Sequence, residues 1–326
     1  MKPFPEAKQL ARMSISNIKS FIDSIGTDTE NEKIIDLLRN DTRAGVKALA
    51  RKLENKNLRK QNLYLKLEKM LELEKKIHAE GMKTIAGVDE AGRGPLAGPV
   101  VSACVILPEN PELTGLDDSK KMTAKSREEM YVRITKSAVA WGIGMADNDE
   151  IDEIGILEAT MKSMRRAVRN MGEKPDIVLI DGNKTPGLNF KERAIVNGDS
   201  ISLSIAAASV IAKVTRDRIM TELDSMFPGY GFVRHKGYGA SAHAAAIGKL
   251  GPCDIHRFSF KLVPSSAPPG TCSRILKKRL QNAPTVEMLE RVATGIARVK
   301  NSLHKSDVEE LRKIYKVCKK RFSGVL

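Results

Sequence analysis

Short apolar segments alternate with longer amphipathic ones between residues 83 and 264, and this alternation constrains the fold more than any other feature. The apolar segments have the length of strands, and the amphipathic ones repeat their apolar residues at helical spacing. Strands are expected at 83–90, 98–107, 138–147, 175–181 and 193–197, and helices at 150–171 and 204–227. Because the first strands follow one another as in hairpins and helices link the later ones, the order predicts an α/β domain.

The two ends of the chain have a different texture. Residues 1–82 are expected to form a helical N-terminal extension, because apolar side chains recur at helical spacing through their second half. Residues 265–326 begin with a Pro-, Ser- and Gly-rich stretch that is expected to be a linker. Two helices, at about 286–303 and 307–322, are expected to follow it. The prediction is therefore a central domain at 83–264 with a helical extension on each side.

The net charge of +15 at pH 7 indicates a polyanionic partner, because Lys and Arg neutralise phosphates and release counterions. The ends of the chain carry this excess: +5 in residues 1–82 and +9 in residues 265–326, against +1 in residues 83–264. A solvated basic face is the alternative for either end. Aromatic residues make up only 4% of the chain, which argues against base stacking as the main mode of binding there.

The sequence also indicates the cellular compartment of the protein. It has no apolar run of the roughly 18 residues that a membrane span needs, and its N-terminus lacks the apolar stretch of a secretory signal. The four cysteines are not at metal-ligand spacing, so reduced thiols are expected. We expect a cytoplasmic monomer that does not bind membranes.

The acidic pair Asp89-Glu90 ends the first expected strand and is followed at once by the glycine-rich segment 92–94. Carboxylates on a rigid strand end suit hard cations such as Mg²⁺, and two such ions can activate a water and stabilise a leaving oxygen. The glycines allow another chain to approach closely, with N–H groups exposed to a phosphate or a sugar hydroxyl. An ordinary strand-to-loop turn is the alternative.

Two further acids occupy comparable places. Asp181 ends the apolar strand IVLID, where a buried carboxylate is costly unless it is hydrated, paired or bound to a metal. The alternative for Asp181 is an Asx turn at the strand exit. Asp199 lies between a short strand and the helix at 204–227, and its alternative is a turn or helix-start acid. The spacing alone does not establish that the four acids converge.

The central domain, over about residues 83–262, resembles ribonuclease HII in several long motifs that occur in the family's order. They are GVDEAGRGPLAGPVV at 87–101, DSK at 118–120, DG at 181–182, NGDSISLSIAAASVIAKVTRDRIM at 197–220, FPGYGF at 227–232, HKGYG at 235–239, GP at 251–252 and HR at 256–257. One position departs from the pattern. Ala240 stands where the family often has Thr, so one polar contact near the substrate is expected to be missing.

The resemblance implies a ribonuclease H-like fold, which is a mixed sheet flanked by helices. It implies that a two-metal site with Mg²⁺ or Mn²⁺ is held by the four catalytic acids Asp89, Glu90, Asp181 and Asp199. The implied substrates are RNA in RNA–DNA hybrids and single ribonucleotides embedded in DNA duplexes, as arise in DNA replication and repair. The implied products carry 5′-phosphate and 3′-hydroxyl ends.

The resemblance also implies substrate contacts. The segment Gly92-Arg93-Gly94 is the expected reader of the ribose 2′-hydroxyl, the group that distinguishes RNA from DNA. Tyr238 is expected to pack against the sugar of the following deoxynucleotide, and a core tyrosine is its alternative. The other expected substrate contacts are Ser119, Lys120, Ser209 and Lys213. The last two lie one helical turn apart, and an ordinary surface lysine is the alternative for Lys213.

Two other functions stay open at this point. A non-catalytic hybrid-binding protein would keep the basic ends and lack one or more acids, whereas all four acids are present. Ribonuclease HIII resembles the same fold but tends not to carry Gly-Arg-Gly-Pro after the Asp-Glu pair. Residues 1–82 resemble the N-terminal extension of some bacterial ribonuclease HII enzymes, which implies hybrid binding or packing against the core. The charge of residues 265–326 leads to the hypothesis that they add phosphate contacts.

Overall fold

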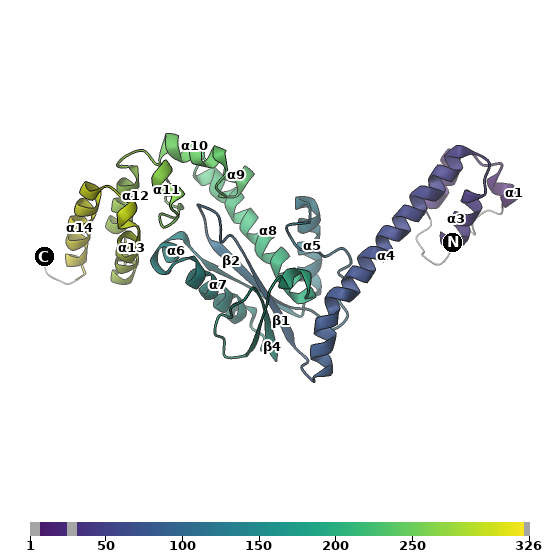
Figure 1. The fold of residues 1–326 in the computed structure, drawn as a ribbon, viewed down its shortest axis with the longest axis horizontal. Helices are drawn as coiled ribbons and strands as arrows, with labels where there is room; N and C mark the ends of the chain where they lie inside the picture. Colours follow the sequence, from purple (N-terminus) through teal and green to yellow (C-terminus); the bar gives the residue numbers. More distant parts are fainter. Residues whose placement is uncertain (1–6, 25–30, 323–326) are drawn as a thin grey trace. The chain divides into compact units, whose positions relative to one another are not determined.

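The five predicted strands form one mixed sheet in the computed structural model, which describes residues 7–24 and 31–322 (Figure 1). Side by side, the strands are β3 (Ala140–Ala146), β2 (Val100–Ile106), β1 (Ile85–Ala91), β4 (Ile177–Asp181) and β5 (Lys191–Ile195). The strands β1, β2 and β3 pair antiparallel, whereas β4 pairs parallel with both β1 and β5. The expected hairpin link holds for β1 and β2 only, because a helix at Ala124–Ser137 connects β2 to β3. The α/β prediction and the mixed sheet are thus confirmed.

Alternate residues of β1 face two different helices. Ala86 and Val88 pack into a hydrophobic cluster with residues of α7 (Ile156–Met171). On the other face, a Cβ at Gly87 would lie 2.1 Å from the carbonyl carbon of Ser204 in α8 (Leu203–Met226). Because side chains alternate along a strand, Asp89 shares the α8 face with Gly87. Close packing of α8 on β1 therefore places the first predicted acid beneath this helix.

The helix predicted at 150–171 is two helices, α6 (Asn148–Ile154) and α7. The prediction was wrong here because Gly155 has φ 85°, a conformation that ends one helix and redirects the chain into the next. The carboxylate of Asp147 caps α6 by accepting a 2.7 Å hydrogen bond from the amide of Glu150. The sequence did not indicate four other helices, namely α5 (Ala124–Ser137), α9 (Phe232–His235), α10 (Ser241–Leu250) and α11 (Leu262–Ser266).

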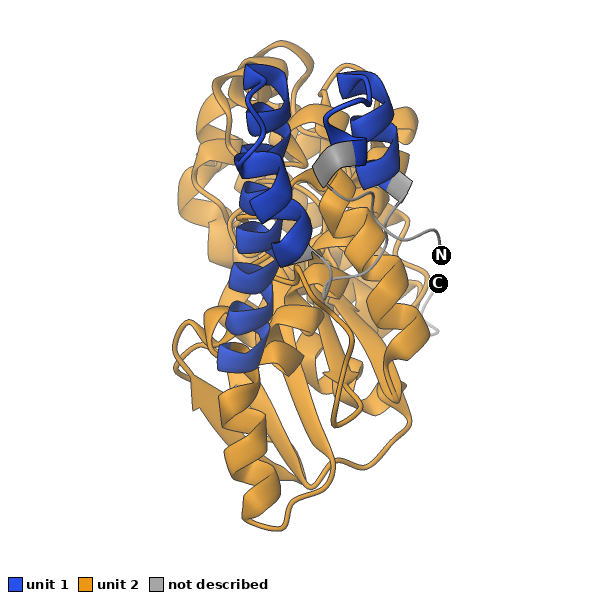
Figure 2. Ribbon diagram, turned by 90° about the vertical axis from the view of Figure 1, so that its right-hand side faces the viewer, with its two compact units in different colours: residues 1–69 blue, residues 70–326 orange. Residues whose placement is uncertain are grey.

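The chain divides into two compact units, residues 1–69 and 70–326 (Figure 2). The described part of the first unit is helical: α1 (Ala7–Leu10), α2 (Ile15–Ser24), α3 (Asn31–Arg39) and most of α4 (Ala44–Ala79), which continues into the second unit. Ile18, Leu38 and Val46 are fully buried in its own small core. The last turns of α4 belong to the second unit, where Glu74 accepts hydrogen bonds from Ser202 and from the amide of Ser204.

The C-terminal part of the second unit is helical, as predicted, but it begins earlier than expected. A helix that the sequence did not indicate, α12 (Thr271–Gln281), follows directly on Pro268, Pro269 and Gly270, so the predicted linker is short. Then come α13 (Val286–Val299) and α14 (Lys305–Lys320). All four cysteines are buried and free, and none of the described helices is long and apolar enough to cross a membrane.

Candidate active site

Asp89 lies on β1 beneath α8, with only 4% of its surface exposed. Burial raises the pKa of its carboxyl group well above 3.8, and the carboxylates of Glu90 and Asp181 raise it further. Two hydrogen bonds oppose this shift: one from the Ser209 hydroxyl, and one from the Glu90 amide at 2.7 Å. Asp89 is therefore a buried acid whose charged form has few partners in the chain itself.

Glu90 is next to Asp89 at the end of β1, and its side chain is also largely buried. Burial raises the pKa of this carboxyl group, as does the nearby Asp181. The guanidinium group of Arg93, 3.2 Å away, lowers it. The strand ends at Ala91, so the two adjacent acids both reach Asp181 electrostatically although they start on opposite faces.

Asp181 and Asp199 approach the same point from β4 and from the 3-10 turn η1 (Gly198–Ser200). Oδ1 of Asp181 accepts a 2.7 Å hydrogen bond from the amide of Gly198, next to Asp199. Asp199 is 5% exposed, and burial, Asp118 and Asp181 all raise the pKa of its carboxyl group. Lys120 Nζ, 3.6 Å from Asp199 Oδ2, opposes that shift. The fold thus brings Asp181 within electrostatic range of each of the other three predicted acids.

A fifth acid, Asp118, joins this group although it was not among the predicted catalytic residues. Its Oδ1 accepts a 2.9 Å hydrogen bond from the amide of Lys120, and its Oδ2 lies 3.5 Å from Lys121 Nζ. Burial alone would lower the pKa of Lys120, but Asp199, Asp89 and Asp118 outweigh it and raise that pKa. The DSK motif was the available signal for Asp118, but no spacing rule places that loop beside Asp199.

The donor chemistry of this cluster fits a hard divalent cation, because it offers several carboxylate oxygens whose mutual repulsion a cation would relieve. The side chains as they stand are engaged otherwise, Glu90 with Arg93 and Asp199 with Lys120. Within residues 7–24 and 31–322, no three His, Cys, Asp or Glu side chains are arranged so that they could hold a metal ion. The carboxylates would therefore have to move closer together to hold a cation.

Two buried arginines hold the glycine-rich loop beside the acids. Gly92 has φ +96°, and a Cβ there would lie 2.0 Å from Nε of Arg216, so only glycine fits. Arg216 donates hydrogen bonds to the carbonyls of Ala97 and Pro99, at 3.1 and 3.0 Å. Arg257 donates to the carbonyl of Gly92 at 2.6 Å. Sequence reasoning missed both roles, since a buried arginine on a remote segment has no local signal.

Tyr238 lies beside this loop, with Cε1 3.9 Å from the position of a Cβ on Gly94. It is 42% exposed and hence not a core tyrosine. Lys213 Nζ is 5.7 Å from the centroid of the tyrosine ring, and 2.8 Å from Asp217 Oδ1 on its own helix. The exposed ring, Lys213 and the glycine loop therefore border one surface next to the acids.

The hydroxyl groups of Ser119 and Ser209 are 2.9 Å apart and both residues are buried. The Ser209 hydroxyl also bonds to Asp89, so the two serines lie under the acids rather than on the surface of the site. Ala240, which stands where the family often has Thr, is the N-cap of α10 and provides no side-chain hydrogen bond to the helix.

Comparison with known proteins matches two segments of the chain to families. Residues 86–263 match the family described as "Ribonuclease HII", and residues 14–78 match "Ribonuclease HII N-terminal domain". Residues 264–326 lie outside both matches.

Curated relatives are similar over longer stretches. One named "Ribonuclease HII" from Acetivibrio thermocellus is 46% identical over 251 residues, which cover 77% of this chain and 98% of the relative. Another of that name from Geobacter metallireducens is 54% identical over 193 residues, which cover 59% of this chain and 91% of the relative. A solved structure titled as the ribonuclease H2 from Pyrococcus horikoshii OT3 has a TM-score of 0.49 at 27% identity, covering 56% of this chain and 96% of that one.

Proposed function

Because this chain belongs to the ribonuclease HII family and is thus a ribonuclease H, we propose that it cleaves the RNA strand of RNA–DNA hybrids and incises DNA at single embedded ribonucleotides. The observation that carries the proposal is the convergence of Asp89, Glu90, Asp181 and Asp199 beside the glycine-rich loop. A hybrid-binding protein without activity would have no use for a costly cluster of buried carboxylates.

We propose that these four acids bind Mg²⁺ or Mn²⁺ as a two-metal site. Such ions, when bound, lower the pKa of water and offset the charge that develops on the leaving oxygen. The chain's own part is to hold the carboxylates in place. Ser209 orients Asp89 through its hydroxyl, and the amide of Gly198 orients Asp181. Arg93 and Lys120, which now neutralise Glu90 and Asp199, become free to meet the phosphates.

Recognition of the ribonucleotide is proposed to depend on Gly92, Arg93 and Gly94. A Cβ on Gly94 would be in ordinary van der Waals contact with Cε1 of Tyr238, 3.9 Å away, and the exposed Arg93 side chain lies at the edge of the acids. A sugar placed against the exposed Tyr238 ring and this loop would bring its 2′-hydroxyl against the backbone of the loop. Hydrolysis on the 5′ side of that ribonucleotide leaves 5′-phosphate and 3′-hydroxyl ends. Lys213, together with Lys120, is proposed to contact the phosphates that flank it.

The proposal assigns auxiliary roles to the two ends of the chain. Residues 1–82, with a net charge of +5, are proposed to help bind the hybrid duplex. In residues 265–326, phosphate contacts are proposed only for exposed basic side chains, such as those of Lys313 and Lys316. Replacing both by Gln should weaken duplex binding and reduce the slope of log K against log salt by up to about 2. An unchanged slope would contradict the proposal that these lysines contact phosphates.

The test uses two DNA duplexes, one with a single embedded ribonucleotide and one with a run of ribonucleotides. The wild-type chain with Mg²⁺ or Mn²⁺ should incise both, and chelation by EDTA should stop both reactions. Asp89→Asn should abolish cleavage and still bind the duplex. Cleavage within the run alone would favour the ribonuclease HIII alternative, and cleavage by Asp89→Asn would overturn the role of the acids.

A further inference from the structure

The C-terminal helices lie outside the two family matches but share a hydrophobic core with the catalytic part of the chain. Leu276 and Leu280 of α12 and Leu289 of α13 belong to one buried cluster with Leu96 and Phe258. Leu96 follows the glycine-rich loop, and Phe258 follows Arg257. The extension therefore packs against the two chain segments that determine where this loop lies.

Arg257 is the direct support of the glycine-rich loop. Its guanidinium group donates to the carbonyl of Gly92 at 2.6 Å, of Arg93 at 3.0 Å and of Gly98 at 2.9 Å. The residue is fully buried, and burial together with the nearby Arg216 lowers its pKa to about 9. Because its donors are directed to backbone carbonyls, a displaced guanidinium group would displace the loop with it.

Asp152 of α6 fixes the chain immediately after Arg257. Its Oδ2 accepts a hydrogen bond from the amide of Phe258 at 2.9 Å. Its Oδ1 accepts from the amide and the hydroxyl of Ser259, at 2.8 and 2.6 Å. Asp152 is itself only 5% exposed, so this carboxylate depends on its few partners to remain charged.

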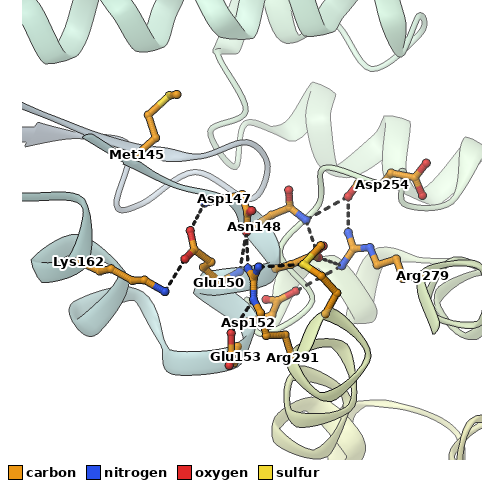
Figure 3. A network of polar contacts seen from close by, with 12 residues as sticks. Met145, Asp147, Asn148, Glu150, Asp152, Glu153, Lys162, Asp254, Arg279 and Arg291 are labelled. Carbon is orange, nitrogen blue, oxygen red and sulfur yellow. Dashed lines mark hydrogen bonds and ion pairs between the residues drawn. The ribbon is translucent and has the colours of Figure 1, made fainter. Parts of the chain in front are cut away.

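Arg279 of α12 joins Asp152 to the backbone just before Arg257 (Figure 3). Its Nη1 lies 2.7 Å from Asp149 Oδ1 and 3.8 Å from Asp152 Oδ2. Its Nη2 donates to the carbonyl of His256 at 3.2 Å and to that of Asp254. Only 9% of the side chain is exposed, so these contacts are shielded from solvent. Its Cζ also lies 4.9 Å from the ring centroid of Phe258, so one guanidinium group from the extension touches both flanks of Arg257.

Charge complementarity explains why the extension docks here. The α6 segment is acidic, and Arg291 of α13 pairs with Asp147 at 3.2 Å and with Glu153 at 2.9 Å (Figure 3). Lys278 pairs with Asp254 at 3.0 Å, at a more exposed position. Part of the basic excess of residues 265–326 therefore serves to hold the extension on the acidic side chains of the catalytic part of the chain.

We propose that Arg279 is a positioning residue for the ribose-reading loop, acting through Asp152 and the Arg257 segment on the carbonyls of Gly92 and Arg93. The inference rests on the proposed function, in which that loop reads the ribose. The C-terminal extension is then a built-in part of substrate selection: through Arg279, which is buried and does not touch the substrate itself, it sets where the loop lies.

The test compares Arg279→Met with Lys278→Met in the full chain. Both variants remove one positive charge from neighbouring positions of α12, but only the first removes the contacts to the flanks of Arg257. Arg279→Met should lower kcat on the single-ribonucleotide duplex by roughly tenfold to a hundredfold, with KM nearly unchanged, because the loop is misplaced by a fraction of an ångström. Amide hydrogen exchange in residues 92–99 should accelerate, and Arg279→Lys should lie between Arg279→Met and the wild type.

The results of these experiments distinguish the positioning role of Arg279 from the proposed function. Wild-type kcat and wild-type exchange in Arg279→Met would overturn the proposal, as would equal losses in Lys278→Met. If Arg279→Met does not fold, Arg279→Lys takes its place, and wild-type exchange at 92–99 in that variant overturns the proposal. If the wild-type chain does not incise the ribonucleotide duplex, the proposed function fails, whereas the exchange experiment still decides whether Arg279 positions the loop.

Discussion

The carboxylate of Asp181 accepts a 2.7 Å hydrogen bond from the backbone amide of Gly198, which ties the end of β4 to the turn that carries Asp199. Asp181 therefore combines two roles: it fixes the place of a second acid, and it adds its own negative charge to the site. An amide side chain keeps an oxygen that can accept the bond from Gly198, so substitution can separate the two roles.

Asp181→Asn should reduce cleavage by more than about a hundredfold, beyond what loss of an outer-shell partner of a metal typically costs. Its thermal stability should stay near that of the wild type, because the hydrogen bond to Gly198 survives. Asp181→Ala should lose activity and, in addition, about 1–3 kcal/mol of stability, because the Gly198 amide loses its partner. Single-turnover cleavage and thermal unfolding distinguish the two variants, and near-wild-type cleavage by Asp181→Asn would contradict the assignment.

Asp89 should make stability depend on pH in the absence of divalent cations. Burial, Glu90 and Asp181 raise the pKa of Asp89, so the folded chain holds this proton more tightly than the unfolded chain. The free energy of unfolding then falls as pH rises from about 4 through the raised pKa. Asp89→Asn removes this loss, so it should increase Tm at pH 7 by about 2–4 °C for each 1 kcal/mol recovered.

Calorimetry in EDTA between pH 4 and pH 8 measures this effect. The gain in Tm for Asp89→Asn over the wild type should shrink as the pH approaches 4, where the wild-type carboxyl group is protonated. A gain that is the same at every pH would show that the effect comes from packing and not from charge.

Gly92 and Gly94 should respond differently to an added methyl group. Gly92→Ala should lower stability by about 1–3 kcal/mol, because φ is +96° and the Cβ would meet Arg216 at 2.0 Å. Gly94→Ala should fold normally, since the nearest atom is 3.9 Å away, but it should impair incision by filling the space beside Tyr238. Thermal unfolding and kcat/KM on the single-ribonucleotide duplex test the pair. Normal incision by Gly94→Ala would argue against a sugar in that space.

Tyr238 should contribute to binding through its ring and not through its hydroxyl group. The ring is exposed, with Lys213 and Arg216 each 5.7 Å from its centroid. Tyr238→Ala should lower kcat/KM roughly tenfold to a hundredfold, the effect of losing about 1–3 kcal/mol of ring contact. Tyr238→Phe should remain close to the wild type. A large loss in Tyr238→Phe would instead assign the contact to the hydroxyl group.

Ala240 offers a stabilising substitution. It is the N-cap of α10 and provides no hydrogen bond to the first turn of the helix. Ala240→Thr should supply that bond and raise stability by about 0.5–2 kcal/mol, with cleavage unchanged. Denaturant unfolding measures the gain. A change in kcat without a change in stability would indicate instead that the side chain at position 240 contacts the substrate.

The strands and several helices could be predicted from the sequence, because secondary structure depends on patterns that extend over a few residues. The alternation of apolar segments predicted the strands, and helical periodicity predicted α4 and α8. The same logic failed at α6 and α7, where a single glycine at φ 85° interrupts an otherwise continuous helical pattern. It also missed α12, because a Pro- and Gly-rich stretch hides how soon the next helix begins.

The sequence by itself determined which residue types could form the site: acids at strand ends, a glycine-rich loop after the first of them, and a family resemblance that ordered these motifs. Only the tertiary structure decided which residues surround them. Asp118 joins the acids through a loop, Arg257 reaches the glycine loop from a segment more than 150 residues away along the chain, and Arg279 pairs with Asp149 from the C-terminal extension. Burial gives such contacts their strength, and burial depends on how distant segments pack together, which no local pattern of residues records.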